Sequence, residues 1–277
     1  MKKIIIYCGG GLSNRIFPVV SGIEFARMTG RELFIYWPVD RICTAKFNEL
    51  YKDNLNVIEE DFLNNLNDEE TEYHSRYIES VDNDFNLYGR SFYKNKLKSG
   101  KVKIGEIVKE TNSKNICFFS NTFMRIIPNN LNEKNLRALE IVEDCKQSIE
   151  YFTKELGLNK NIIGAHVRGT DFDKNVDYYV NKIKSVLEYS NQQVFVSSDD
   201  IQYETSLFNI FPDNVIFRKN KKYVKKQNPT TSWTNNTYMV DVETMKDAIV
   251  DLYLLSKTNL KVYDDRSSYS LYARILS

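Results

Sequence analysis

The chain has 277 residues, with 38 Lys plus Arg against 37 Asp plus Glu and a formal net charge of +1. This length exceeds what one hydrophobic core usually supports, so we expect two domains, at residues 1–150 and 151–277. The balanced charge provides no basic field and argues against a nucleic-acid-binding protein. Hydrophobic residues make up 42% of the sequence, which is enough for packed cores and predicts a globular chain.

The four cysteines have neither the spacing of metal ligands nor the density of a disulfide framework, which predicts reduced, buried thiols in a cytosolic protein. They are Cys8, Cys43, Cys117 and Cys145. The apolar run from Ile4 stops at Gly9 before an export core forms, and no stretch approaches the roughly 20 apolar residues of a membrane span. We therefore expect a cytoplasmic protein.

The N-terminal half opens with a strand, a glycine turn, a helix and a second strand, which together form a βαβ unit. Apolar residues follow helical spacing from the glycine turn to Gly30. The stretch from 54 to 114 is polar and irregular, and the sequence leaves its architecture open. Residues 135–156 carry apolar residues on one side and predict a long helix. Strands are predicted at 4–8, 33–37 and 116–119.

The C-terminal half repeats the alternation of strands and helices. Strands are predicted at 162–167, 193–197, 214–217 and 260–263, and helices at 178–189, 201–208, 242–256 and 268–276. Because one helix separates successive strands, the sheet should be parallel with right-handed crossovers. The fold class is therefore α/β, with two Rossmann-like domains.

Three glycines between the first strand and the first helix form a candidate anion site. Backbone N–H groups and the helix dipole favour an anion there, so Gly10, Gly11, Asn14 and Arg15 are candidates to face a ligand. A plain tight turn is the alternative interpretation. Asn14 stands where the dinucleotide fingerprint has its third glycine, but Asp40 follows the second strand. A nicotinamide enzyme therefore stays an alternative.

Arg168 comes directly after the apolar strand 162–167. Ligands of parallel sheets bind beyond the carboxyl ends of the strands, and a guanidinium matches phosphate oxygens two at a time. Arg168 at this position therefore indicates nucleotide chemistry. The alternative is an ion pair with Asp171 or Asp173, since structural ion pairs resemble sites.

Polar residues also follow two other strands of the C-terminal sheet. Ser198 and Asp199 leave the strand at 193–197, on the edge where Arg168 lies, and either cap the next helix or contact a ribose or an acceptor. Ser267 and Ser268 stand where the last strand leads into the last helix. They either cap that helix or form, with its free backbone donors and Arg168, a cradle for a diphosphate.

Five lysines lie between residues 219 and 226, ahead of a segment that contains Trp233. Solvated charge is the default interpretation of such a cluster. The alternative is a long basic loop that closes as a lid over a sugar diphosphate.

Several of these segments together resemble one enzyme superfamily. Residues 164–171, Gly-Ala-His-Val-Arg-Gly-Thr-Asp, resemble the His-x-Arg-x-x-Asp motif of the GDP-fucose-dependent fucosyltransferases. This superfamily comprises α1,2-, α1,6- and protein O-fucosyltransferases. Residues 10–15 resemble the Gly-Gly-Leu-Gly-Asn-Arg/Gln segment of these enzymes. Residues 251–256 and 266–270 are similar to their Asp-x-x-x-Leu-Ser and Ser-Ser-Phe-Ser elements. Many of these enzymes carry a second arginine where this chain has Gly169.

The resemblance implies a GT-B fold, with two sheets facing across a cleft and the donor held by the C-terminal domain. Arg168 would hold the β-phosphate, and His166 and Asp251 would meet the guanine side. Ser267 and Ser268 would bind phosphate oxygens. The acceptor would bind on the N-terminal side.

The implied reaction is a single displacement with inversion at the fucose anomeric carbon and departure of GDP. Asp173 is the nearest carboxylate available as a general base. The resemblance implies no metal and no cofactor. Asp171-Phe172-Asp173 also spells the Asp-x-Asp manganese motif of another glycosyltransferase fold, which we attribute to chance in an Asp-rich chain.

The expected partners are GDP-fucose, or another GDP-sugar, and a glycan acceptor. Peripheral contact with a lipid-linked glycan at the inner face of the membrane is compatible with this assignment. An NAD(P)-dependent oxidoreductase and a non-catalytic protein that binds a sugar nucleotide or glycan are the alternatives. The sequence does not distinguish fucose from another sugar.

Overall fold

A computed structural model describes residues 1–40, 42–52, 55–75, 113–120, 122–124, 127–169, 175–188, 191–226 and 238–277. The chain forms two compact units. The first comprises Met1–Asn48 and Lys52–Leu139, and the second comprises Glu49–Tyr51 and Glu140–Ser277. The units therefore divide in sequence ahead of residue 150.

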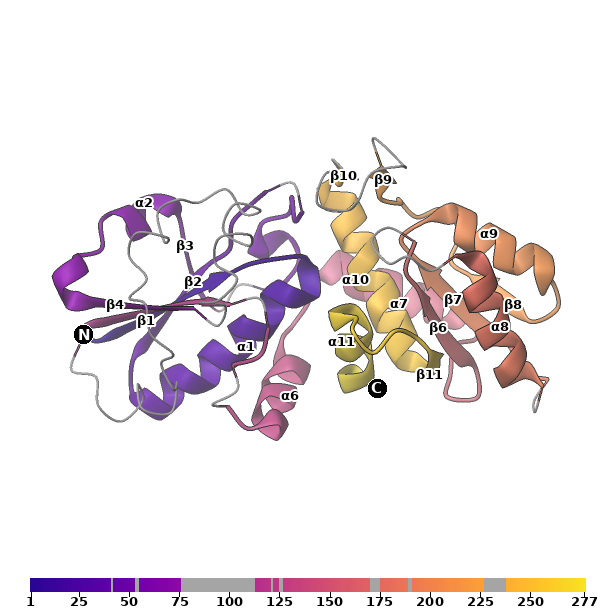
Figure 1. Cartoon of the computed structure of the whole chain (residues 1–277), viewed down its shortest axis with the longest axis horizontal. Coiled ribbons are helices and arrows are strands. Elements are labelled where there is room, and N and C mark those ends of the chain that lie inside the picture. Colours follow the sequence, from indigo (N-terminus) through magenta and orange to yellow (C-terminus); the bar gives the residue numbers. More distant parts are fainter. Residues whose placement is uncertain are drawn as a thin grey trace. The chain divides into compact units, whose positions relative to one another are not determined.

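The first unit contains a parallel sheet with the strand order β3-β2-β1-β5-β4 among its described residues (Figure 1). Helix α1 packs on one face, where Gly22 lies so close to Ile6 that a Cβ would come within 2.6 Å of its side chain. Helix α2 covers the other face, where Leu63 joins an aromatic core. The strands are β1 (Lys3–Cys8), β2 (Glu32–Tyr36), β3 (Asn56–Ile58), β4 (Thr71–Ser75) and β5 (Asn115–Ser120). The helices are α1 (Leu12–Thr29), α2 (Glu60–Asn64), α6 (Asn129–Ala138) and the short 3-10 turns η1 (Phe47–Glu49) and η2 (Asp68–Glu70).

The second unit contains a parallel sheet with the order β11-β6-β7-β8. Helices α8 and α9 cover one face, and α7, α10 and α11 cover the other (Figure 1). Its strands are β6 (Ile163–Val167), β7 (Val194–Ser198), β8 (Val215–Phe217) and β11 (Asn259–Val262), with a separate antiparallel pair, β9 (Lys225–Lys226) and β10 (Tyr238–Met239). Its helices are α7 (Glu143–Glu155), α8 (Val176–Leu187), α9 (Ile201–Ile210), α10 (Val242–Lys257) and α11 (Ser268–Leu276).

The predicted α/β class with parallel sheets in both halves is confirmed. The single helix predicted at 135–156 is wrong, because α6 ends at Ala138 and α7 begins at Glu143. Between them Ile141 forms an antiparallel bridge with Tyr51, and the backbone N–H of Val142 donates to the carbonyl of Leu50. These contacts replace helical hydrogen bonds, so the apolar residues there pack as extended chain.

All four cysteines are buried and free, as predicted. Burial raises the pKa of the Cys145 thiol to about 12, so this thiol is protonated at neutral pH. No helix in the described ranges is both long enough and apolar enough to cross a membrane.

Candidate functional site

Strand β6 delivers Arg168 to the carboxyl end of the sheet in the second unit. The five residues of β6 are buried, and Arg168 is the first residue beyond them. The Tyr179 hydroxyl, from α8, donates to the Arg168 carbonyl at 3.3 Å and accepts from its N–H at 3.1 Å. These bonds fix the backbone, while the Arg168 side chain keeps 31% of its surface exposed. Tyr179 was not predicted as a site residue, because it is buried in the core and gives no polar signal in the sequence.

Asp199 contacts both residues that follow β6. Its Oδ2 lies 3.5 Å from Arg168 Nε, and its Oδ1 accepts from the N–H of Gly169 at 2.7 Å. Asp199 leaves β7, the strand next to β6, so the predicted meeting of the two strand exits is confirmed. The pairing orients the guanidinium through its Nε edge.

Gly169 occupies a position with no room for a side chain. A Cβ there would lie 2.7 Å from the Cβ of Asp200 and 3.0 Å from the ring of Tyr203. The start of α9 therefore packs directly against the backbone after Arg168. This contact explains why the chain has glycine where an arginine is expected from the resemblance.

Ser198 and Asp200 organise the turn between β7 and α9. Asp200 caps α9 by accepting from the N–H of Gln202 at 2.9 Å, and Ser198 Oγ accepts from the N–H of Asp200 at 3.1 Å. Ser198 is buried. The helix cap predicted for Ser198 or Asp199 thus belongs to Asp200, and Asp199 is left to contact Arg168.

The start of α11 lies against the end of β6. Ser267 caps α11 by accepting from the N–H of Ser270 at 3.2 Å, and Ser268 is the half-buried first residue of the helix. His166 is buried on β6, with Nδ1 2.7 Å from the Ser270 hydroxyl and its ring 4.8 Å from the ring of Tyr269. The helix N-terminus and the strand that carries Arg168 are therefore joined directly.

Asp251, on α10, lies in a buried cluster of charged side chains. Its Oδ1 accepts from Arg218 Nε at 2.6 Å, and its Oδ2 accepts from Lys221 Nζ at 2.5 Å and from the Ser197 hydroxyl at 3.1 Å. Burial raises its pKa, but the charges of Lys221 and Arg218 outweigh that effect and hold the pKa of Asp251 below its usual value. Both oxygens of Asp251 are thus engaged by internal partners.

The lysines between residues 219 and 226 differ in burial and in their partners. Lys221 is buried and reaches Glu204 and Asp251, whereas Lys222 is exposed and pairs with Asp241. Residues 227–237, which include Trp233, lie outside the described ranges. Neither interpretation of the lysine cluster, as solvated charge or as a lid, anticipated the burial of Lys221.

The glycine turn in the first unit is held from inside by Arg15. The guanidinium is fully buried, donates to the carbonyl of Gly10 at 2.6 Å and to that of Pro38, and pairs with Asp40 at 2.7 Å. Arg15 therefore points into the unit and orients the turn. Gly10 has a φ of 85°, a backbone conformation that favours glycine. Gly11 is the N-cap residue of α1 and has no side chain to cap the helix. Asn14 is half-buried on the first helical turn.

Asp40 does not have the surroundings of a cofactor-binding acid. One oxygen pairs with Arg15, and the other accepts from the N–H groups of Ile42 and Cys43 at 2.9 and 3.1 Å. These bonds account for Asp40 as part of a turn. Asp171 and Asp173 lie outside the described residues, and the described part of the chain contains no group of three or more His, Cys, Asp or Glu residues placed to hold a metal ion.

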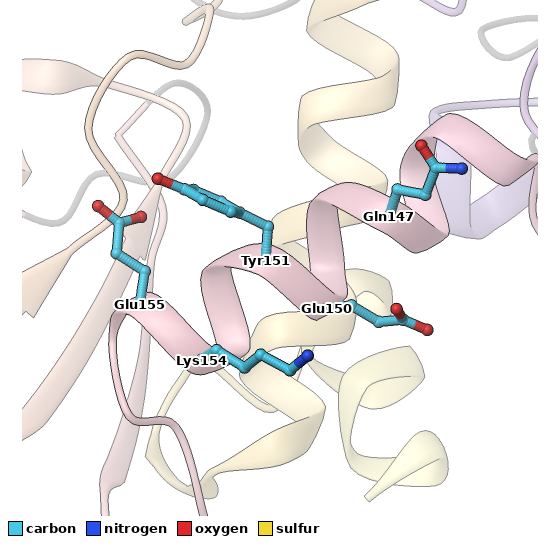
Figure 2. A pocket seen from close by; sticks show the side chains of 5 residues that line it. All are labelled: Gln147, Glu150, Tyr151, Lys154 and Glu155. Atoms are coloured by element: carbon cyan, nitrogen blue, oxygen red, sulfur yellow. The ribbon is translucent and has the colours of Figure 1, made fainter.

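A separate surface hollow lies along α7 and not at the strand ends (Figure 2). Its side chains all come from that one helix, and Tyr151 among them is 60% exposed. They are Gln147, Glu150, Tyr151, Lys154 and Glu155. None of the residues described above lines this hollow.

Comparison with known proteins identifies the class of fold. No protein-family model matches the sequence, and no curated protein sequence matches it significantly. Solved structures match along the whole chain: NodZ α-1,6-fucosyltransferase co-crystallised with GDP has 18% identity and a TM-score of 0.66, covering 100% of this chain and 93% of its own. Another crystal of NodZ comes from the Bradyrhizobium protein, with 16% identity and a TM-score of 0.65, covering 100% of this chain and 94% of its own.

Two further fucosyltransferase structures share the fold. A mutant of Arabidopsis thaliana FUT1 in complex with GDP has 15% identity and a TM-score of 0.57, covering 100% of this chain and 68% of its own. POFUT1 in complex with GDP has 12% identity and a TM-score of 0.56, covering 99% of this chain and 94% of its own. The chain therefore has the α/β fold of this group of fucosyltransferases.

Proposed function

We propose that this protein is a glycosyltransferase that moves fucose from GDP-fucose to a hydroxyl of a glycan, by inversion and without a metal ion. The observation that carries the proposal is the placement of Arg168. Arg168 is the first residue after β6, and His166 on the same strand contacts Ser270 in the first turn of α11. The shared fold with GDP-bound fucosyltransferases supports this choice of donor.

The donor diphosphate would lie between Arg168 and the start of α11. Negative charge builds on the β-phosphate as the bond to fucose breaks, and a guanidinium with helix-end N–H groups stabilises that charge. Ser267 and Ser268 belong to this cradle, and Asp199 orients the arginine. His166 supports the cradle from β6 through Ser270.

Asp251 has a different part in this proposal from the one the resemblance implies. Its carboxylate is buried and holds Arg218, Lys221 and Ser197, so we assign it to the floor of the donor site and not to direct contact with guanine. The second unit would then hold the donor. The first unit, with Gly11 and Asn14 half-buried and Gly10 buried at its glycine turn, would hold the acceptor.

In the proposed step, the acceptor oxygen attacks the anomeric carbon of fucose as the bond to the β-phosphate oxygen breaks. The acceptor oxygen loses its proton, and GDP leaves with the electron pair of the broken bond. Asp173 remains the candidate for the base that takes the proton, since it follows Arg168 closely in sequence. The glycan acceptor, including a lipid-linked one at a membrane surface, remains part of the proposal.

A nucleotide panel tests the proposed function. GDP and GDP-fucose should raise the melting temperature, and NAD and UDP should not, because a ligand that binds only the folded state stabilises it by mass action. Arg168→Ala should weaken the GDP shift. Stabilisation by NAD alone would favour the oxidoreductase. GDP-fucose binding with no release of GDP across a panel of glycan acceptors would favour a non-catalytic binding protein.

A further inference from the structure

The end of β7 is held by a buried pair of opposite charges. Glu204, on α9, is fully buried, and its Oε1 accepts from the N–H of Ser198 at 2.7 Å and from Lys221 Nζ at 2.5 Å. Lys221 also donates to the carbonyl of Ser198 at 3.0 Å. The pair therefore hydrogen-bonds both the backbone N–H and the backbone carbonyl of Ser198. The hydroxyl of Tyr223 closes the cluster by donating to the other oxygen of Glu204 at 2.5 Å.

The residue held in this way immediately precedes Asp199. Asp199 in turn accepts from the N–H of Gly169 and lies 3.5 Å from Arg168 Nε. A continuous series of contacts thus runs from the pair through Ser198 and Asp199 to the guanidinium. It links α9 and the segment after β8 to the exit of β6.

We propose that Glu204 and Lys221 are positioning residues for the transfer reaction, because together they fix the Ser198 backbone and thereby the placement of Asp199 and Arg168. This inference rests on the proposed function. Neither side chain would touch the substrate. Their effect would be on the geometry of Arg168, where a misplacement of about 1 Å can cost about a hundredfold in rate.

The chemistry of the pair favours positioning over stability. Removing two charges from water is costly, and a buried ion pair often adds no stability over apolar side chains of similar volume. Here the charges also provide directed hydrogen bonds to the N–H and carbonyl of Ser198, which apolar side chains cannot replace. Asp251, which shares Lys221, keeps the lysine ammonium oriented between the two acids.

The test compares Glu204→Gln and Lys221→Met with Lys222→Met as the matched control. Lys222 is the next residue, is exposed and pairs with Asp241 outside the cluster. For the two cluster variants we expect kcat for fucose transfer to fall about 10- to 100-fold, with KM for GDP-fucose changed less than about threefold. Lys222→Met should keep the kcat of the unmodified protein. Lys221→Arg, which retains the charge and donors, should recover part of the rate.

A double-mutant cycle separates positioning from general destabilisation. If the pair acts through Asp199, Glu204→Gln should lower kcat much less in an Asp199→Asn background than alone. If either cluster variant fails to fold, the neutral double variant Glu204→Gln with Lys221→Met replaces it. That variant removes both charges of the pair, so neither is left buried without the other.

The outcomes distinguish this inference from the proposed function. An unmodified protein that binds no GDP and transfers no fucose contradicts the proposed function, and the inference with it. An active protein whose cluster variants lose melting temperature but keep kcat contradicts the inference alone. Full additivity of Glu204→Gln and Asp199→Asn in kcat would also overturn it.

Discussion

Arg168 and Gly169 are neighbours in the chain with opposite requirements for a side chain. Arg168 needs its guanidinium at the surface beside Asp199, whereas Gly169 needs to have no Cβ, because Asp200 and Tyr203 pack against its backbone. The end of β6 thus places one cation at the surface and leaves no room for a side chain at the next residue. With Gly169 in place of a second arginine, the proposed site depends on Arg168 for the charge at this edge.

Replacing Arg168 with alanine should nearly abolish transfer. Loss of one preorganised donor to the developing charge typically costs about 3–4 kcal/mol in the transition state, or a factor of about 100 to 1,000 in kcat. The melting temperature should change little, since the guanidinium is partly exposed and a surface ion pair contributes about 0–1 kcal/mol. Initial-rate measurements of GDP release with Arg168→Lys as the comparison test this. A fully active Arg168→Ala variant would remove Arg168 from the mechanism.

Replacing Gly169 with alanine should lower both stability and transfer rate. The added methyl group would overlap Asp200 and Tyr203, and overpacking of this kind costs about 1–3 kcal/mol. Displacement of the neighbouring backbone should also move Arg168. Gly157→Ala is the control, because its φ of 61° strains alanine, yet nothing lies within 4 Å of the new methyl group. Urea denaturation should show both variants destabilised, while rate assays show only Gly169→Ala impaired.

At the scale of elements, capped helix starts define the edge of the sheet in the second unit. Asp200 caps α9, Asp241 caps α10 and Ser267 caps α11, each by accepting a backbone N–H with its side chain. Such a cap fixes where a helix begins and therefore where the preceding loop ends. The position of the α11 N-terminus beside β6 follows from this together with the bond between His166 and Ser270.

The Asp241 cap should give α10 a pH-dependent stability. Its hydrogen bonds with Lys222 and Thr244 lower the pKa of Asp241 to about 2, from the ordinary value of 3.8. A lowered folded-state pKa means that the contribution is complete above pH 3.8 and is lost as the pH falls toward 2. Asp241→Ala should cost about 1 kcal/mol at neutral pH.

Urea denaturation at several pH values checks the Asp241 prediction. Asp241→Asn retains a capping oxygen but cannot ionise, so its stability difference from the unmodified protein should shrink between pH 6 and pH 2.5. The side chain is 58% exposed, which screens its charge interactions and limits the change to about 1 kcal/mol or less. A difference that stays constant or grows in acid would contradict this assignment.

At the scale of the whole molecule, the chain passes between its two compact units more than once. Residues 49–51 belong to the second unit although they lie between β2 and β3 of the first sheet in sequence. There Leu50 and Tyr51 provide the backbone partners for Val142 and Ile141, ahead of α7. The second unit is therefore completed by a short segment from the N-terminal half.

Transfer by the whole protein should be insensitive to chelators. In the proposed mechanism the arginine and the start of α11 supply the positive field at the diphosphate, which is the task a divalent cation performs in metal-dependent enzymes. Rates measured with excess EDTA should equal those measured without it. A rate that disappears in EDTA and returns only with manganese would assign Asp171 and Asp173 to a metal site.

The sequence alone determined the features that depend on local pattern. Apolar runs and helical spacing predicted the strands that carry the site, the α/β class and the shared sheet edge of Arg168 and Asp199. The ion pair between these two residues was not predicted, since only Asp171 and Asp173 were considered as partners of Arg168. Local pattern missed β3 and β4, which lie at the edges of a sheet in or beside a polar stretch and are defined by pairing with β2 and β5. It also predicted one helix at 135–156, because apolar spacing does not reveal that extended residues bond to a distant segment.

Only the tertiary structure decided which polar residues face inward. Arg15, Lys221 and Asp251 appear in the sequence as ligand-facing or solvated groups, yet each is buried with partners from other segments. Glu204 and Arg218 gave no sequence signal for the same reason. The partner of a buried charge is set by which strands and helices the fold brings together, and the free-energy cost of burying a charge without a partner makes that pairing obligatory.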